Sequence, residues 1–421
     1  MATALTQAQI DIVKSTAPVL KEHGVNITTT MYNNLLAANP DLRNVFSMTS
    51  QTTGRQPRAL AGAVLAYATY IDDLPKLHDA VELIAHKHAS LQITAPQYDL
   101  VGQTLIAAIG QVLGDAATPD IVDAWTKAYA VLAGVFIGRE AELYEIQRQH
   151  NWLGWRKFRV ARRVAETDIV ASFYLEPTDG GPLPAYLPGQ YVSLQIFVPE
   201  LGFLQSRQYS LSESPAKTGG KYYRISVKKE PGEVLDHPGL ISNMLHAGYD
   251  AGAEVELTHP QGDFFVDPAD KAKEGVPAVL MSAGVGCTPM MSILGSLTAD
   301  DAAVKRPVSW VQGARSSRTL PFANAVRDIT RANPNVTASV FLTTVNDQDK
   351  IGVDYHFGET RIDLEKLDKD KDLFLGDKRA EYFVCGPQLF MIQTQRALLG
   401  KGIEQERIHL EVFETGGVGA A

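Results

Sequence analysis

The chain has 421 residues, enough for about two or three ordinary domains, each with its own core. Its formal net charge is −9 and its acidic residues are spread along the chain, so no continuous basic face is available to a nucleic acid. The only cysteines, Cys287 and Cys385, are far apart, which excludes a disulfide framework, a cysteine-rich zinc site and an iron–sulfur cluster. A reducing compartment fits this cysteine usage.

The first residues have neither a basic stretch followed by an apolar run nor an arginine-rich composition, so we expect no secretion signal or transit peptide. The longest apolar runs, near 130–138 and 276–286, are too short to span a bilayer. We therefore expect a cytoplasmic protein with no stable membrane insertion and no nucleic-acid partner.

Residues 1–148 have the pattern of a helical domain. Apolar residues recur at helical spacing in 6–24, where Thr6 is expected to cap the helix and Gly24 to end it. A second helix is expected to stop at 39–40, because the residue before a proline avoids the α region. Further helices are expected at 60–71, around His88, and from near Pro96 and Pro119. The pattern predicts an all-α domain of about seven helices.

Beyond 150–158 the apolar period changes to two, and short strand-like runs are separated by turn residues. Ile169, Ala171, Phe173 and Leu175, for example, alternate with more polar neighbours, which favours antiparallel strands closing into a small barrel. From about 276, strand-like runs alternate with helical stretches, which is typical of a parallel α/β sheet. These runs are 276–283, 307–312, 337–345 and 381–385. The predicted domains are 1–148 (all-α), 152–269 (antiparallel β-barrel) and 270–421 (α/β).

Two glycine-containing turns follow strands of the α/β region. In "SAGVGCTPM", Gly284 and Gly286 allow a tight turn close to a pyrophosphate, which the following helix N-terminus would attract. A proline stands where the dinucleotide fingerprint has its third glycine, so a simple turn without a ligand stays an alternative. "CGP", 385–387, repeats the form after the last predicted parallel strand, at the edge where such sheets bind ligands.

In the barrel region "RQYS", 207–210, supplies a guanidinium, an aromatic face and a hydroxyl along one strand. These groups suit a phosphate and a flat ring, but a partly solvated strand explains the tetrapeptide as well. In the helical region His86 and His88 are two residues apart and point to different helix faces. Neither has the i,i+4 partner of a helical zinc clip, and both read, on this evidence alone, as ordinary surface or core histidines.

The motifs "PGQY" (188–191), "RQYS", "RISVK" (224–228), "SAGVGCTPM" and "CGP" resemble, in this order, a ferredoxin–NADP reductase module. With a globin-like domain in front, the whole chain resembles the flavohaemoglobins. The resemblance implies haem b, FAD and either NADH or NADPH as cofactors. It also implies the small molecules O2 and NO as substrates, and no obligate protein partner.

For the haem, the resemblance implies that His88 is the axial ligand, while His86 keeps its ordinary reading. Tyr98 and Glu140 match the pair behind that histidine, and Tyr32 matches the distal hydroxyl. The other implied haem contacts are Phe46, Gln56, Leu60 and Lys87. Without the family context, Tyr32 reads as a half-buried helix tyrosine, and Glu140 and Lys87 as solvated charges. Pro57 leaves open where Gln56 points.

For the flavin, the resemblance implies contacts from Tyr191, Arg207, Gln208, Tyr209, Ser210 and Ser242, with Phe413 covering the ring. For the nicotinamide nucleotide it implies Gly284, Gly286, Thr288, Pro289, Cys385, Gly386 and Pro387. Cys287 and the ending "FETGGVGAA" depart from the family pattern. Arg315 and Arg318 can meet a 2′-phosphate or simply be exposed, so the choice between NADH and NADPH stays open.

NAD(P)H gives up two electrons as hydride and haem iron accepts one at a time, so a flavin has to stand between them. The activity that the resemblance implies is nitric oxide dioxygenation, the conversion of NO and O2 to nitrate. Two alternatives stay open: a haem or flavin reductase acting on peroxides or other acceptors, and an oxygen- or redox-sensing globin.

Overall fold

The computed structural model describes residues 4–230, 239–300 and 302–413. By their internal contacts the residues fall into two compact units. Of the described residues, the first unit comprises those up to Trp155 with Gln195–Arg207, and the second comprises Arg156–Leu194 with those from Gln208 to Phe413. The three predicted domain limits, 1–148, 152–269 and 270–421, stay predictions. The last residues of the atypical ending, 414–421, lie outside the described residues.

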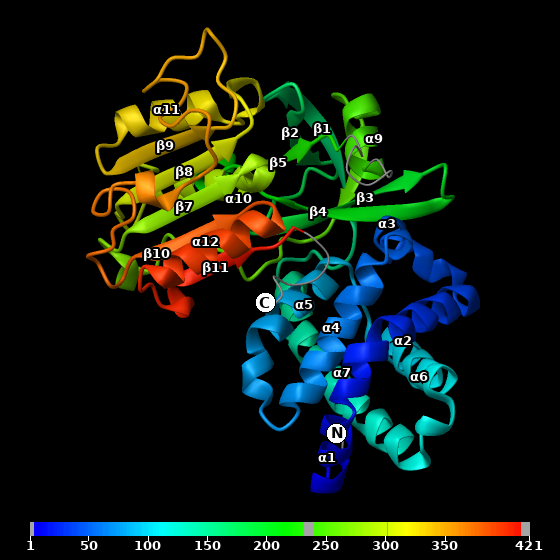
Figure 1. The fold of residues 1–421 in the computed structure, drawn as a ribbon. Coiled ribbons are helices and arrows are strands. Elements are labelled where there is room, and N and C mark those ends of the chain that lie inside the picture. The colour runs from blue at the N-terminus through cyan, green and yellow to red at the C-terminus, as the bar shows by residue number, and fades with distance from the viewer. Residues whose placement is uncertain (1–3, 231–238, 301, 414–421) are drawn as a thin grey trace. The chain divides into compact units, whose positions relative to one another are not determined.

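The first unit is built on α-helices, drawn in blue to cyan in Figure 1. Up to residue 149 the described residues form seven of them, as the sequence predicts. They are α1 (Gln7–Ser15), α2 (Ala17–Ala38), α3 (Met48–Thr52), α4 (Arg55–Tyr70), α5 (His78–Ser90), α6 (Ala95–Leu113) and α7 (Pro119–Gln149). The short 3-10 helix η1 (Pro40–Asn44) leads from α2 towards α3.

The prediction that Gly24 ends the first helix is wrong. The chain breaks at Thr16 instead, because Pro18 in the first turn of α2 has no N–H to continue the α1 hydrogen-bond ladder. Gly24 lies inside α2, where an added Cβ would be 3.5 Å from that of Ala61 on α4. This is an ordinary contact distance, so a small side chain would also fit here and the glycine is not required by the packing of the two helices. The predicted cap is confirmed, since Thr6 forms a capping box with Gln9.

α7 is long and apolar enough, by length and composition, to cross a membrane. Its Trp125, Phe136 and Leu143 are nevertheless buried among the other helices. The core helix of a helical domain passes the same test, so the length of α7 does not indicate a membrane span.

Six strands form the antiparallel sheet predicted for the middle of the chain, in the order β4-β3-β6-β1-β2-β5. Leu211, directly after β4, pairs with Ile225 of β5, so the two edge strands meet as in a barrel. The strands are β1 (Arg156–Ala165), β2 (Val170–Pro177), β3 (Tyr191–Val198), β4 (Phe203–Ser210), β5 (Tyr223–Lys228) and β6 (Glu254–Leu257). The short α8 (Pro215–Thr218) and α9 (Leu240–Gly248) lie between strands.

Strand β2 does not show the expected division into a buried and a solvated face. Its residues Val170–Leu175 are all buried. Ser172, on the face expected to be polar, bonds through its hydroxyl to Glu166 at 2.6 Å and lies 2.7 Å from Ser226. A serine on a buried face is tolerated because its hydrogen bonds are made within the protein.

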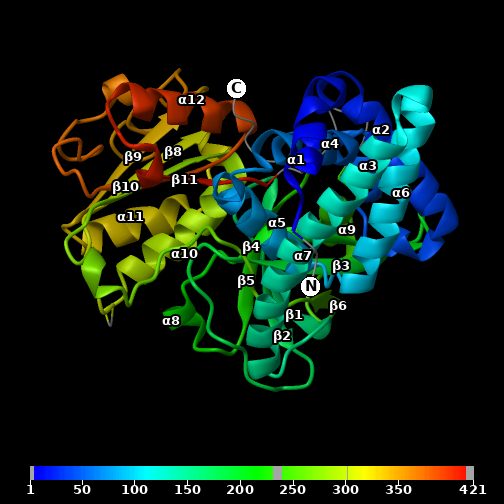
Figure 2. The same ribbon diagram turned by 90° about the horizontal axis from the view of Figure 1, so that it is seen from below.

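The second sheet is parallel, in the order β11-β10-β7-β8-β9, with α12 on one face and α10 and α11 on the other (Figure 2). Its strands are β7 (Ala278–Ala283), β8 (Val308–Ala314), β9 (Val336–Leu342), β10 (Glu381–Cys385) and β11 (Ile408–Glu411). The helices are α10 (Cys287–Leu297), α11 (Ala323–Ala332) and α12 (Gln388–Gly400). The α/β fold class is thus as predicted, and β11 is an additional strand.

Candidate functional site

Three polar side chains from α5, α6 and α7 meet around His88. The Nδ1 atom of His88 lies 2.8 Å from Glu140 Oε1 and 2.8 Å from the Tyr98 hydroxyl, which itself donates to the Glu140 carboxylate. An ionised carboxylate only accepts hydrogen bonds, so Nδ1–H is assigned as the donor to Glu140. The other ring nitrogen, Nε2, then keeps its lone pair. This is the arrangement that a histidine needs to coordinate a metal and to be oriented from behind.

Glu140 and Tyr98 are both buried, Glu140 with only 2% of its surface exposed. Burial, followed by the negative charge of Glu140 and their shared hydrogen bond, raises the pKa of Tyr98 far above its ordinary value. Tyr98 therefore remains a neutral donor. Phe136, one helical turn before Glu140, stacks on Tyr98 with ring centroids 6.4 Å apart and an interplanar angle of 20°. Phe136 was not among the predicted site residues, although its i,i+4 spacing from Glu140 was a usable signal.

A second group of predicted residues meets at Tyr32 of α2. The side chain of Tyr32 is 5% exposed, its hydroxyl accepts a hydrogen bond from Gln56 Nε2 at 3.3 Å, and the Phe46 ring meets it edge-on at 5.4 Å. Burial raises the pKa of Tyr32 to about 12 despite the bond from Gln56, so the hydroxyl keeps its proton. Within the described residues that proton has no acceptor, which leaves Tyr32 as a donor for a bound molecule.

The direction of Gln56, left open by the sequence, is decided by the start of α4. Gly54 has a φ of +68°, and the helix begins at Arg55. Pro57 is its third residue, where a missing N–H costs no helical hydrogen bond. Gln56 in this first turn consequently reaches Tyr32.

The apolar core of the helical unit is divided into two clusters. One contains Tyr32, with Phe46 and Leu60 packed against it, and the other contains Tyr98 and Phe136. Among the described residues no group of three or more His, Cys, Asp or Glu side chains could hold a bare metal ion. The site therefore fits a metal that is carried in an apolar ring, as in haem. It offers one histidine with a free Nε2, apolar walls and a protonated phenol.

The remaining residues of the sequence "AHKHASL" take no visible part in this arrangement. His86 is buried, with Nε2 3.9 Å from a carboxylate oxygen of Glu82, in agreement with its ordinary reading. Lys87 is half-buried, and its role stays a prediction.

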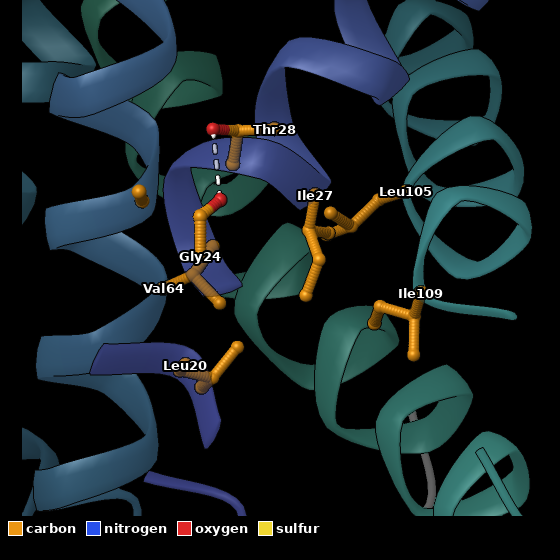
Figure 3. A pocket seen from close by; sticks show the side chains of 8 residues that line it. Leu20, Gly24, Ile27, Thr28, Val64, Leu105 and Ile109 are labelled. Carbon is orange, nitrogen blue, oxygen red and sulfur yellow. Dashed lines mark hydrogen bonds between the residues drawn. The ribbon is translucent and has the colours of Figure 1, made fainter. Parts of the chain in front are cut away.

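A small apolar cavity lies deeper in the same helices, between α2, α4 and α6 (Figure 3). Its volume is about 10 Å3, near the minimum for one water molecule, and the Thr28 hydroxyl at its wall is turned to the Gly24 carbonyl at 3.0 Å. None of the residues predicted to contact haem lines it. It is a packing gap lined by Leu20, Gly24, Ile27, Thr28, Ala61, Val64, Leu105 and Ile109.

The residues predicted to bind flavin are spread over the barrel strands and α9. Ser210 is 5% exposed, and its buried Oγ has no hydrogen-bond partner among the described residues. A buried hydroxyl without a partner is costly, so a ligand that bonds to Ser210 fits this position. Tyr191, on β3, is buried. On β4, Tyr209 is half-buried and Gln208 is exposed.

Two of the predicted flavin contacts are engaged with the protein itself. Arg207 donates to the carbonyl of Ser206 at 2.6 Å and to Thr49 Oγ1 at 3.2 Å. Ser242 donates to the Gly239 carbonyl at 3.0 Å and accepts from the Glu230 N–H at 3.3 Å. Phe413 is 44% exposed. The flavin roles of these three residues stay predictions.

The two glycine turns of the α/β region lie against each other at the carboxyl ends of β7 and β10. Gly284 has a φ of +58°, and a Cβ added to Gly286 would lie 2.2 Å from the carbonyl oxygen of Cys385 and 2.8 Å from the nitrogen of Gly386. Only glycine fits at position 286. The structure thus brings the two predicted nucleotide loops together at the ligand-binding edge of a parallel sheet.

Other residues of these loops support the backbone. Thr288 and Pro289 are buried in the first turn of α10, where Thr288 Oγ1 donates to the Val285 carbonyl at 3.1 Å. Pro387 precedes α12. Cys287 and Cys385 are free and buried, and burial raises the pKa of both thiols, so neither is a ready nucleophile.

Comparisons with known proteins cover the whole chain. A globin family model matches residues 29–136, and an oxidoreductase NAD-binding domain model matches residues 280–396. The flavohemoproteins of Bordetella pertussis and Rhizobium meliloti are 46% and 44% identical to this chain, each over 97% of it and 98% of their own length.

Solved structures agree. The flavohemoglobin of Malassezia yamatoensis, described with bound FAD and heme, has a TM-score of 0.83 and 30% identity, covering 98% of this chain and all of its own. The flavohem-like FAD/NAD-binding domain of the nitric oxide dioxygenase of Vibrio cholerae has a TM-score of 0.52 and 33% identity, covering 61% of this chain and 98% of its own. A globin unit and a flavin- and NAD-binding reductase module therefore occur together in one chain, and this chain belongs to the flavohaemoglobin family.

Proposed function

We propose that this protein is a NAD(P)H-dependent nitric oxide dioxygenase that binds haem, FAD and the nicotinamide nucleotide and forms nitrate from NO and O2. The observation that carries the proposal is the buried Glu140 carboxylate 2.8 Å from His88 Nδ1. A globin that only stores oxygen does not need a negative charge behind its axial histidine. The cytoplasm is proposed as its compartment, since both cysteines are free thiols.

On the proximal side, the residues of the chain hold a proton and a charge in place. Glu140 accepts a hydrogen bond from the Nδ1–H group of His88 and thereby makes Nε2 more electron-donating. Tyr98 gives a second hydrogen bond to the same carboxylate and keeps it from rotating. When bound at Nε2, haem iron supplies the oxygen-binding and one-electron chemistry that no side chain provides.

On the distal side, Tyr32 presents a protonated hydroxyl whose position Gln56 fixes by donating to its oxygen. Phe46 and Leu60 add apolar walls that exclude water. A pocket with one donor and otherwise apolar walls suits two small, nearly apolar substrates such as O2 and NO. In the reductase module, Ser210 offers its unpartnered hydroxyl to the flavin, and the loops around Gly286 offer the nucleotide backbone N–H groups.

The test is to supply NO to the purified holoprotein in air-saturated buffer with NADH or NADPH. We expect rapid NO consumption, nitrate as the product, and one nicotinamide oxidised for every two nitrates, because a hydride carries two electrons. Peroxide consumption with little NO turnover would instead support the reductase alternative. Oxygen binding without turnover of either would support a sensing globin.

A further inference from the structure

Gln205 of strand β4 is a buried amide whose partners all lie on backbone. It is 2% exposed and belongs, with Gln195–Arg207, to the unit that contains the globin helices. Its Oε1 accepts the Met48 N–H at 2.9 Å. Its Nε2 donates to the carbonyls of Arg43 at 2.8 Å and Leu204 at 2.8 Å, and lies 3.3 Å from that of Phe46.

These bonds fix the backbone on both sides of Ser47, the residue that caps α3. The Phe46 carbonyl and the Met48 N–H belong to the turn between η1 and α3, where backbone groups lack the regular partners of a longer helix. Gln205 supplies those partners from a residue about 160 positions away in the chain. The ring of Phe46 extends from this turn and meets Tyr32 edge-on at 5.4 Å.

Neighbouring contacts of the same strand do not reach the Phe46 backbone. The Leu204 N–H donates to Asn44 Oδ1 at 2.9 Å, and Arg207 Nη2 donates to Thr49 Oγ1 at 3.2 Å. They attach the strand to residues before and after the turn. The contact of Gln205 Nε2 with the Phe46 carbonyl differs from these, because it lies on the backbone of the residue that carries the aromatic ring.

We propose that Gln205 is a positioning residue for Phe46, and that through this ring it controls how fast diatomic ligands enter and leave the Tyr32 side of the haem. The proposal rests on the proposed haem site but not on the proposed NO reaction. It also gives β4, the strand that contains the "RQYS" motif, a second task, that of shaping the globin pocket.

The experiment compares Gln205→Ala and Gln205→Glu with Asn44→Ala in the full-length holoprotein. Asn44→Ala is a matched control. Asn44 accepts from the Leu204 N–H of the same strand and donates to the Asp41 carbonyl, and neither hydrogen bond involves Phe46. Gln205→Glu keeps the shape and the acceptor for Met48 but replaces the donor by an oxygen facing the carbonyls of Arg43, Phe46 and Leu204. It carries the test even if Gln205→Ala does not yield folded protein.

The readouts are carbon monoxide association and oxygen dissociation after flash photolysis of the ferrous protein, with haem and FAD content measured in parallel. For both Gln205 variants we expect at least about a threefold change in these rates at unchanged cofactor content, and for Asn44→Ala a change below about 1.5-fold, since only coupled neighbours share large effects. Equal changes in all variants would show general loosening of the turn and overturn the proposal.

A double-mutant cycle identifies the route of the effect. In a Phe46→Leu background, Gln205→Ala should add almost nothing to the ligand rates if Gln205 acts through the Phe46 ring. Additive changes would overturn that route. If the parent protein forms no nitrate from NO, the proposed function fails, but these ligand rates still decide the role of Gln205.

Discussion

The two sides of the globin pocket treat their polar groups differently. On the His88 side, groups from three helices form a closed set with a buried charge: Glu140 accepts from both His88 and Tyr98, whose own polar atoms lie 2.8 Å apart. On the Tyr32 side, the Tyr32–Gln56 pair is joined by a single 3.3 Å hydrogen bond, and the Tyr32 proton is left without an acceptor within the described residues. The first arrangement holds a ligand of the iron in one orientation, whereas the second leaves a donor available to a changing set of small molecules.

The strongest test of this contrast removes the coordinating residue itself. His88→Ala should lose nearly all haem, because the variant lacks the Nε2 atom proposed to coordinate the iron. FAD binding and NAD(P)H-dependent dye reduction should remain. Haem and flavin absorbance of the purified variant measure both at once. Retention of full haem content would move the axial ligand elsewhere, and joint loss of both cofactors would contradict separate modules.

A smaller effect is expected when the proximal charge is removed but the histidine remains. Glu140→Gln keeps the shape of the side chain and an acceptor for His88, but the negative charge is lost. Altered partners behind a metal ligand typically reduce activity about ten- to a hundredfold, and we expect NO turnover to fall within that range. The iron midpoint potential should rise, because a less electron-donating imidazole stabilises the ferric state less.

Tyr98→Phe serves as the partial version of that change. It removes one hydrogen bond to Glu140 while leaving the carboxylate and His88 in contact. Its shift in midpoint potential should have the same sign and be smaller than that of Glu140→Gln. A larger shift than that of Glu140→Gln would show that the phenol, not the carboxylate, dominates the proximal side.

On the distal side, Tyr32→Phe removes the donor at nearly constant volume. A hydrogen bond to a charged acceptor contributes on the order of 1.5–3 kcal/mol, so oxygen should dissociate about ten- to a hundredfold faster. Stopped-flow measurement on the ferrous variant checks this, with flavin reduction by NAD(P)H as the unaffected control. A rate within about twofold of the parent would make Tyr32 a packing residue and Gln56 the better candidate donor.

The smallest expected effect is that of pH. With its pKa raised to about 12 by burial, Tyr32 stays protonated where a free tyrosine would already ionise, near pH 10. Because the fold favours the protonated form, the contribution of Tyr32 to stability is fully present below about pH 10 and is lost as the pH rises towards 12. Oxygen dissociation should therefore stay constant from about pH 7 to 10. A step within this range that Tyr32→Phe abolishes would contradict the raised pKa.

The sequence by itself determined much of the architecture, because helix and strand periods are local properties that recur in the chain. The change of apolar period near 150–158, the prolines that begin α6 and α7, and the strand runs before Gly284 and Gly386 correspond to elements of the structure. The order of the motifs also identified the family, which the comparisons with flavohemoproteins confirm.

What only the tertiary structure decided are the contacts between residues far apart in the chain. Gly24 looked like a helix end but lies inside α2, where it packs against Ala61 of α4. The direction of Gln56 required the turn at Gly54, and the 2.8 Å contact of His88 with Glu140, which only the family resemblance implied, required α5 to pack on α7. Gln205 gave no signal at all, since a strand glutamine reads as a solvated side chain until folding brings the backbone of Phe46 and Met48 to it. Local spacing determines which elements form, but the hydrogen bonds of a buried polar group depend on what tertiary packing places beside it.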